Sequence, residues 1–125
     1  YGSQRACTVI REDSFDRTVK HHSWLHFGMS LRAAIKLMER SNLIFVGTNR
    51  AGNNAFFVRM DVANKLPFEI PNMKELDKFT DWRVRESRGS NGKLNFLGMS
   101  ERRQSIADCE LYDLESNSII LVKDL

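Results

Sequence analysis

The sequence is poor in the residues that define several common classes of protein. Only two of its 125 residues are cysteine, and Cys7 and Cys109 have neither the close spacing of a zinc site nor the number needed for a disulfide framework. We therefore expect two reduced thiols, as in a cytoplasmic protein. No apolar run approaches the roughly 18 residues that cross a bilayer, so we also expect no membrane partner.

Glycine is scarce as well, and its seven copies follow no nucleotide-binding pattern. In an α/β fold, a nucleotide-type cofactor usually binds at a glycine-rich turn after the first strand, with an acidic residue at the end of the next strand. The sequence contains neither feature. Spacing alone therefore predicts an α/β domain without an identified chemistry.

The composition is that of a chain that folds. Hydrophobic residues make up 42% and charged residues 28%, which is ordinary globular usage, and the length suits one compact unit. The net charge is only +3, and acidic and basic residues are interspersed rather than gathered into a stripe. Nucleic acid is therefore an unlikely partner.

A helix followed by two strands is the clearest local pattern. Residues 29–40 carry apolar side chains at three- and four-residue spacing, and Ser30, or Ser23 if the helix starts earlier, can cap its start. Residues 43–46 form an apolar run typical of a strand buried on both faces, and residues 55–60 form a second strand. The connection is too short for a crossover helix, so we expect an antiparallel hairpin.

The remaining elements have weaker signals. We expect a long ordered loop before the helix, with extended structure at residues 7–10, and a short helix at residues 73–79. Asn91-Gly92 predicts a hairpin turn between residues 83–88 and 94–97, and the last strand is expected at residues 118–122.

Three histidines lie in an aromatic loop before the helix. No carboxylate or cysteine stands at ligand spacing from them, so we expect no metal. They are loop residues packing beside aromatic rings, or one of them is a general base toward an acceptor hydroxyl. The candidate bases are His22 and His26. The candidate substrate-binding residues of this loop are His21, Trp24 and Phe27.

Two further segments are candidate binding surfaces. The turn at residues 49–54 lacks the lysine of a phosphate-binding loop, but the amides of Asn49, Asn53 and Asn54 can line the mouth of a pocket. The arginines from Arg83 to Arg103, with Trp82, could contact nucleic acid, although acidic residues are threaded among them. A non-enzymatic binding or structural module is therefore the alternative function.

Several segments resemble one family, the FkbM-like class I methyltransferases that depend on S-adenosylmethionine (SAM). Residues 20–34 look like the loop of histidines and aromatic residues that leads into a helix in that family, with Phe27 where tyrosine is common. Residues 43–59, LIFVGTNRAGNNAFFVR, are similar to its closing hairpin, "LVGTN..GNNAFFVR". Residues 79–97 resemble the extension that follows, and residues 1–6 resemble the end of a preceding loop.

The resemblance covers only the C-terminal portion of such an enzyme. It implies that residues 1–62 are the end of a Rossmann-like methyltransferase sheet, a helix followed by an antiparallel hairpin, and that residues 63–125 are an irregular C-terminal extension packing on it. It also implies methyl transfer from SAM to a small-molecule or sugar hydroxyl. The cofactor-binding half is missing, so we expect the chain to be inactive alone and to need that N-terminal half as its partner.

Overall fold

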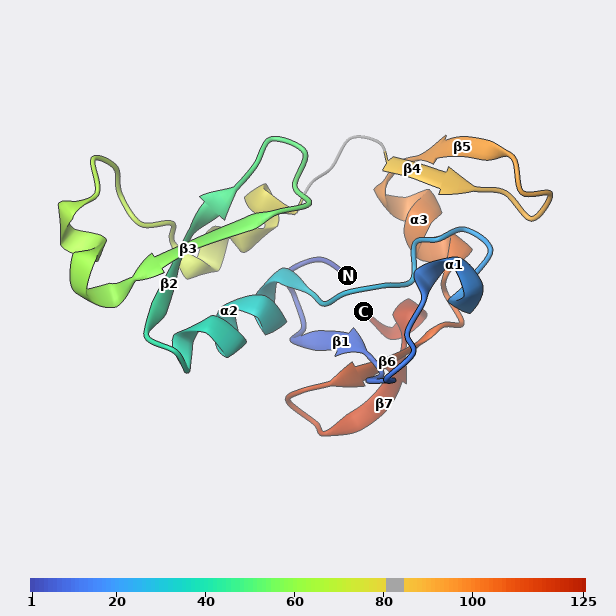
Figure 1. Cartoon of the computed structure of the whole chain (residues 1–125), viewed down its shortest axis with the longest axis horizontal. Helices are drawn as coiled ribbons and strands as arrows, with labels where there is room; N and C mark the ends of the chain where they lie inside the picture. The colour runs from blue at the N-terminus through green and yellow to red at the C-terminus, as the bar shows by residue number, and fades with distance from the viewer. Residues whose placement is uncertain (81–84) are drawn as a thin grey trace.

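The computed structural model describes residues 1–80 and 85–125, which form a mixed α/β structure with small antiparallel sheets (Figure 1). The strands are β1 (Cys7–Val9), β2 (Leu43–Thr48), β3 (Ala55–Arg59), β4 (Arg85–Arg88), β5 (Leu94–Leu97), β6 (Glu110–Asp113) and β7 (Ser118–Leu121). The α-helices are α1 (Arg17–Lys20), α2 (Leu31–Glu39) and α3 (Met99–Ser105), and the 3₁₀ helices are η1 (Met60–Lys65), η2 (Met73–Phe79) and η3 (Val122–Asp124). Within the described residues, no helix combines the length and the apolar character that a membrane span requires.

Strand β1 joins the two ends of the chain. It pairs with β6, which in turn pairs with β7, so the sheet has the order β1-β6-β7 and all its pairs are antiparallel. On its other edge, β1 bonds to the backbone just before α2: the Val9 amide donates to the Gly28 carbonyl at 3.0 Å, and the Ser30 amide donates to the Cys7 carbonyl at 2.8 Å. A segment of three residues therefore holds both the C-terminal hairpin and the start of α2.

Ser30 begins helix α2 and also fixes it to β1. Its hydroxyl accepts hydrogen bonds from the Ala33 amide, as a helix N-cap does, and from the Cys7 amide, both at 3.1 Å. The side chain is 1% exposed, so water cannot replace either bond. The sequence prediction of this helix and of its cap is confirmed.

The predicted hairpin is present as β2 and β3, with an irregularity between Phe45 and Gly47. Gly47 has a φ of 144°, which side-chain-bearing residues rarely adopt, and the glycine therefore allows this bulge. The expected burial of the first strand on both faces is wrong, because only Phe45 is fully buried in β2. In the described part of the chain, β2 and β3 pair only with each other and remain partly open.

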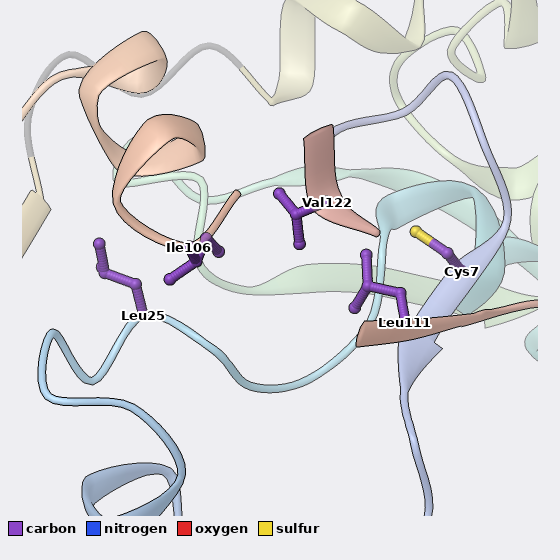
Figure 2. Packing of buried hydrophobic residues seen from close by; sticks show 5 residues of the cluster. All are labelled: Cys7, Leu25, Ile106, Leu111 and Val122. Carbon is purple, nitrogen blue, oxygen red and sulfur yellow. The ribbon is translucent and has the colours of Figure 1, made fainter. Parts of the chain in front are cut away.

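Two hydrophobic clusters form the core. The first contains Cys7, Leu25, Ile106, Leu111 and Val122, whose side chains come together from β1, the loop before α2, the end of α3, β6 and η3 (Figure 2). The second contains Ile35 of α2, Phe45 of β2 and Leu76 of η2. Each cluster combines residues from both sides of the expected boundary at 62/63, so the two parts of the chain pack against each other through shared clusters.

The C-terminal part contains elements that the sequence did not predict. The hairpin around Asn91-Gly92 is confirmed as β4 and β5. Helix α3 and strand β6 were missed, and the short helix α1 replaces part of the expected long loop. Helix α3 has a visible signal, because Glu101 accepts a hydrogen bond from the Gly98 amide at 2.8 Å, as the third residue of a helix often does.

Ser30→Ala should destabilise the protein by about 2 to 4 kcal/mol, because it removes a helix cap and leaves the buried Cys7 amide without its acceptor. Urea unfolding followed by circular dichroism measures the change. The control is Ser41→Ala, at an exposed serine just after α2, which should change stability by less than about 0.5 kcal/mol. Equal effects of the two substitutions would contradict the double role of Ser30.

Candidate functional site

A cavity of about 410 Å³ lies where the β2–β3 hairpin meets the rest of the chain. One wall comes from the hairpin and the end of η2, through Thr48, Asn53, Phe57 and Thr80 among others. The opposite wall comes from the N-terminal residues, the loop before α2 and helix α3. Pockets that bind small molecules have volumes of roughly 300 to 1,000 Å³, so this cavity is large enough for one.

The N-terminal segment closes one side of this cavity and ties the two walls together. Tyr1 and Gly2 line the cavity. The Leu31 amide donates to the Gly2 carbonyl at 3.0 Å, and Arg32 Nε donates to the Ser3 carbonyl at 2.7 Å. The Ser3 hydroxyl also bonds to Asp77 of η2. The position of the cavity therefore depends on residues that are far apart in sequence.

The predicted substrate-binding residues are only partly brought together. Phe27 and Asn53 line the cavity, and they come from the two loops that the sequence singled out. Of the described residues that form its wall, none is His21, His22 or Trp24. Leu25 of the first loop and Gly52 of the second also line the cavity, although neither was predicted to bind substrate.

The other aromatic-loop residues make contacts outside the cavity. Trp24 has a φ of 61°, an unusual value for a bulky residue, and its ring lies under the Arg88 guanidinium at 4.4 Å. The His21 and His22 rings are stacked with centroids 4.2 Å apart, and His21 Nδ1 lies 2.7 Å from the Ser23 hydroxyl. These contacts fix the shape of the loop.

His26 is the predicted base that lies nearest to the cavity wall. It is 8% exposed, and its Nδ1 lies 3.0 Å from the hydroxyl of Tyr1, which lines the cavity. Burial, followed by the charges of His21 and Lys20, lowers the pKa of His26. Burial raises the pKa of Tyr1 well above its usual range. Both pKa shifts favour the neutral forms, a phenol and an imidazole, and a hydrogen bond joins the Tyr1 hydroxyl to His26 Nδ1.

The asparagine turn stabilises itself with its own side chains. Asn49 Oδ1 accepts hydrogen bonds from the amides of Asn53 and Asn54 at 3.1 and 3.2 Å, and its Nδ2 donates to Asn53 Oδ1 at 2.7 Å. The Asn54 side chain is exposed. Asn49 and Asn54 thus shape the turn that places Asn53 at the cavity. Asparagine side chains often stabilise turns in this way, by bonding to nearby backbone amides.

Three cavity residues come from α3, namely Met99, Arg102 and Arg103, and none of them was predicted as a pocket residue. Arg102 is 6% exposed, and both Arg102 and Arg103 line the cavity. In the sequence they belonged to a candidate nucleic-acid surface, but burial of Arg102 and the stacking of Arg88 on Trp24 remove two of its arginines from a continuous patch. Arg83, Trp82 and the side chain of Arg85 lie outside the described residues. Contact with nucleic acid stays a prediction.

The cavity has no metal-binding character and no known relative to define it. Over residues 1–80 and 85–125, no group of three or more histidine, cysteine or acidic side chains could hold a metal ion. Comparison of the chain with family models, with curated proteins and with solved structures finds no match. The geometry of the site therefore has to support a function by itself.

The lowered pKa of His26 predicts that the protein loses stability as the pH falls from 8 to 5.5. The unfolded chain binds a proton near the ordinary pKa of 6.5, whereas the folded chain resists it, so the stabilisation is complete above that value and is lost below it. Urea unfolding at a series of pH values measures this loss. His26→Gln, which can still bond to Tyr1, should reduce the slope, and an unchanged slope would contradict the prediction.

Proposed function

We propose that this chain is the C-terminal segment of an FkbM-like, SAM-dependent methyltransferase, and that it supplies the acceptor side of the reaction. The reaction would transfer a methyl group to a hydroxyl of a small molecule or sugar. The observation that carries the proposal is the cavity between the loop before α2 and the β2–β3 hairpin, because the resemblance assigns acceptor binding to these two segments.

The open hairpin supports the need for a partner half. In a Rossmann-like methyltransferase sheet, a closing hairpin of this kind would pair with further strands. Here β2 and β3 pair only with each other among the described residues, and Phe56 of β3 is 52% exposed. Unpaired strand edges and exposed aromatic rings are typical of surfaces that another chain or segment covers.

The residues of the cavity do not fit SAM. The cofactor of such enzymes is usually held at a glycine-rich turn, with a carboxylate on its ribose hydroxyls. The described residues that line the cavity include no aspartate or glutamate, and the cavity wall contains two arginines. We therefore propose that the missing N-terminal half holds SAM and that this chain holds the acceptor.

His26 is the base that this geometry favours over His22. His22 is exposed and stacks on His21, whereas His26 is buried and bonded to Tyr1 of the cavity wall. A neutral imidazole can accept a proton from an acceptor hydroxyl through the Tyr1 hydroxyl, which would pass its own proton to Nδ1 and take the acceptor's. Holding the acceptor in place would account for most of the remaining contribution of this chain.

Calorimetric titration of SAM into the purified chain tests the first part of this proposal. We expect no heat of binding, because the cofactor-binding half is absent. Addition of that half, as the longer gene product or as a separately encoded partner, should restore SAM binding and methyl transfer. Specific micromolar binding of SAM to this chain alone would contradict the assignment of SAM to the N-terminal half and of the acceptor to this chain.

The exposed hairpin should also make the isolated chain associate. Sedimentation velocity at micromolar concentration should show oligomers, and Phe56→Lys should shift them toward monomer, because a charge on an edge strand opposes pairing. Phe68→Lys is a matched control, since Phe68 is also 52% exposed but lies outside the hairpin. A stable monomer with one sharp melting transition would contradict the fragment proposal.

A further inference from the structure

The charge of the cavity differs from that of the whole chain. Over the whole sequence, 16 acidic residues offset most of the 19 basic ones. In the described cavity wall, by contrast, Arg102 and Arg103 are not accompanied by any acidic residue. A concave site with charges of one sign attracts the opposite charge, and a partly buried guanidinium is screened little by salt.

Arg103 is a cation of this wall whose side chain has a buried donor without a hydrogen-bond partner in the described structure. Its Nε is buried and has no hydrogen-bond partner, and Arg103 forms no ion pair, within residues 1–80 and 85–125. Its Nη2 lies against Gly2, where an added Cβ would be only 2.9 Å away. A buried donor of this kind costs free energy unless something bonds to it, and the planar guanidinium matches the two oxygens of a carboxylate.

The rest of the wall is suited to a flat apolar body. Phe27, Phe57 and Phe79 line the cavity, and its hydroxyl-bearing residues are Tyr1, Ser30, Thr48 and Thr80. Aromatic rings pack well against other rings, and a few hydroxyl groups can orient a polar substituent. The cavity thus offers two guanidinium groups, an aromatic surface and a few hydrogen-bonding groups.

We propose that the cavity binds a small aryl carboxylate, whose carboxylate pairs with the Arg103 guanidinium and whose ring packs among the phenylalanines. That this ligand is the methyl acceptor rests on the proposed function, whereas its binding by the chain does not. Arg103 pairs with the single negative charge of the ligand, and Arg102 adds a second positive charge to the wall. The acceptor class would be aromatic acids that carry a hydroxyl group, with the acid group acting as the handle.

Chemical-shift titration with a matched pair of probes tests this inference on the chain itself. The probes are 4-hydroxyphenylacetate and its neutral amide, 4-hydroxyphenylacetamide. The acid should bind about tenfold or more tightly than the amide, because a hydrogen bond to a charged group contributes more than one between neutral groups. The largest shifts should fall on residues of the cavity wall, such as Phe57 and Thr80.

Variants separate the charge of Arg103 from the shape of the cavity. Arg103→Gln should remove the preference for the acid, whereas Arg40→Gln, which removes an exposed arginine at the end of α2, should keep it. Ala34→Leu, which narrows the cavity, should weaken both probes. If Arg103→Gln does not fold, Arg103→Lys tests the same point and should retain part of the preference.

Three results would overturn the inference. They are no binding of the acid to the wild-type chain, equal binding of the acid and the amide, and an unchanged preference in Arg103→Gln. None of these results bears on methyl transfer, because transfer needs the cofactor half. Conversely, binding of the acid without any transfer in the completed protein would reject the proposed function and keep the aryl carboxylate site.

Discussion

Strand β1 forms backbone hydrogen bonds along both edges, and most of the tertiary structure depends on that pairing. One edge bonds to β6 and thereby holds the C-terminal hairpin. The other edge bonds to Gly28 and Ser30, just before α2. Cys7 is completely buried between these neighbours, so the strand has no edge that faces water at this point. Three residues therefore connect segments that lie at opposite ends of the chain.

The cavity is a consequence of this connection. The C-terminal hairpin and α3 pack on β1 through the first hydrophobic cluster, whereas α2 leads away from β1 to the β2–β3 hairpin and the second cluster (Figure 1). The space between the two clusters is lined by residues of both. Tyr1 and Val122, near the two ends of the chain, both contact this space. A site at such a junction combines side chains from elements that lie far apart in the sequence.

The site joins a buried proton-accepting pair to a cationic wall. His26 is buried and Tyr1 is partly buried, and burial favours the neutral form of each. Arg103 lies in the same wall of the cavity, beside Gly2, with an incomplete set of hydrogen bonds in the described structure. The pair suits an acceptor hydroxyl and the guanidinium suits an acid group. The proposed ligand class and the proposed transfer therefore use different residues of one cavity.

Local elements were predictable where their cause is local. The spacing of apolar residues and the cap at Ser30 predicted α2, and the short turn predicted an antiparallel β2–β3 pair. The Asn91-Gly92 turn predicted a hairpin for the same reason, since turn residues act on their immediate neighbours. Helix α3 escaped prediction because its apolar residues are few and its arginines suggested a solvated surface.

The sequence by itself determined these helices, turns and hairpins, because hydrophobic period, capping and turn geometry act over a few residues. Only the tertiary structure decided which of the candidate residues meet. Strand β6 has little apolar pattern, and its pairing with β1 is a contact between the two ends of the chain. That contact buries Arg102, sets Arg103 beside Gly2 and brings Tyr1 to His26. No periodicity within a segment encodes such distances, because they follow from the packing of the whole chain.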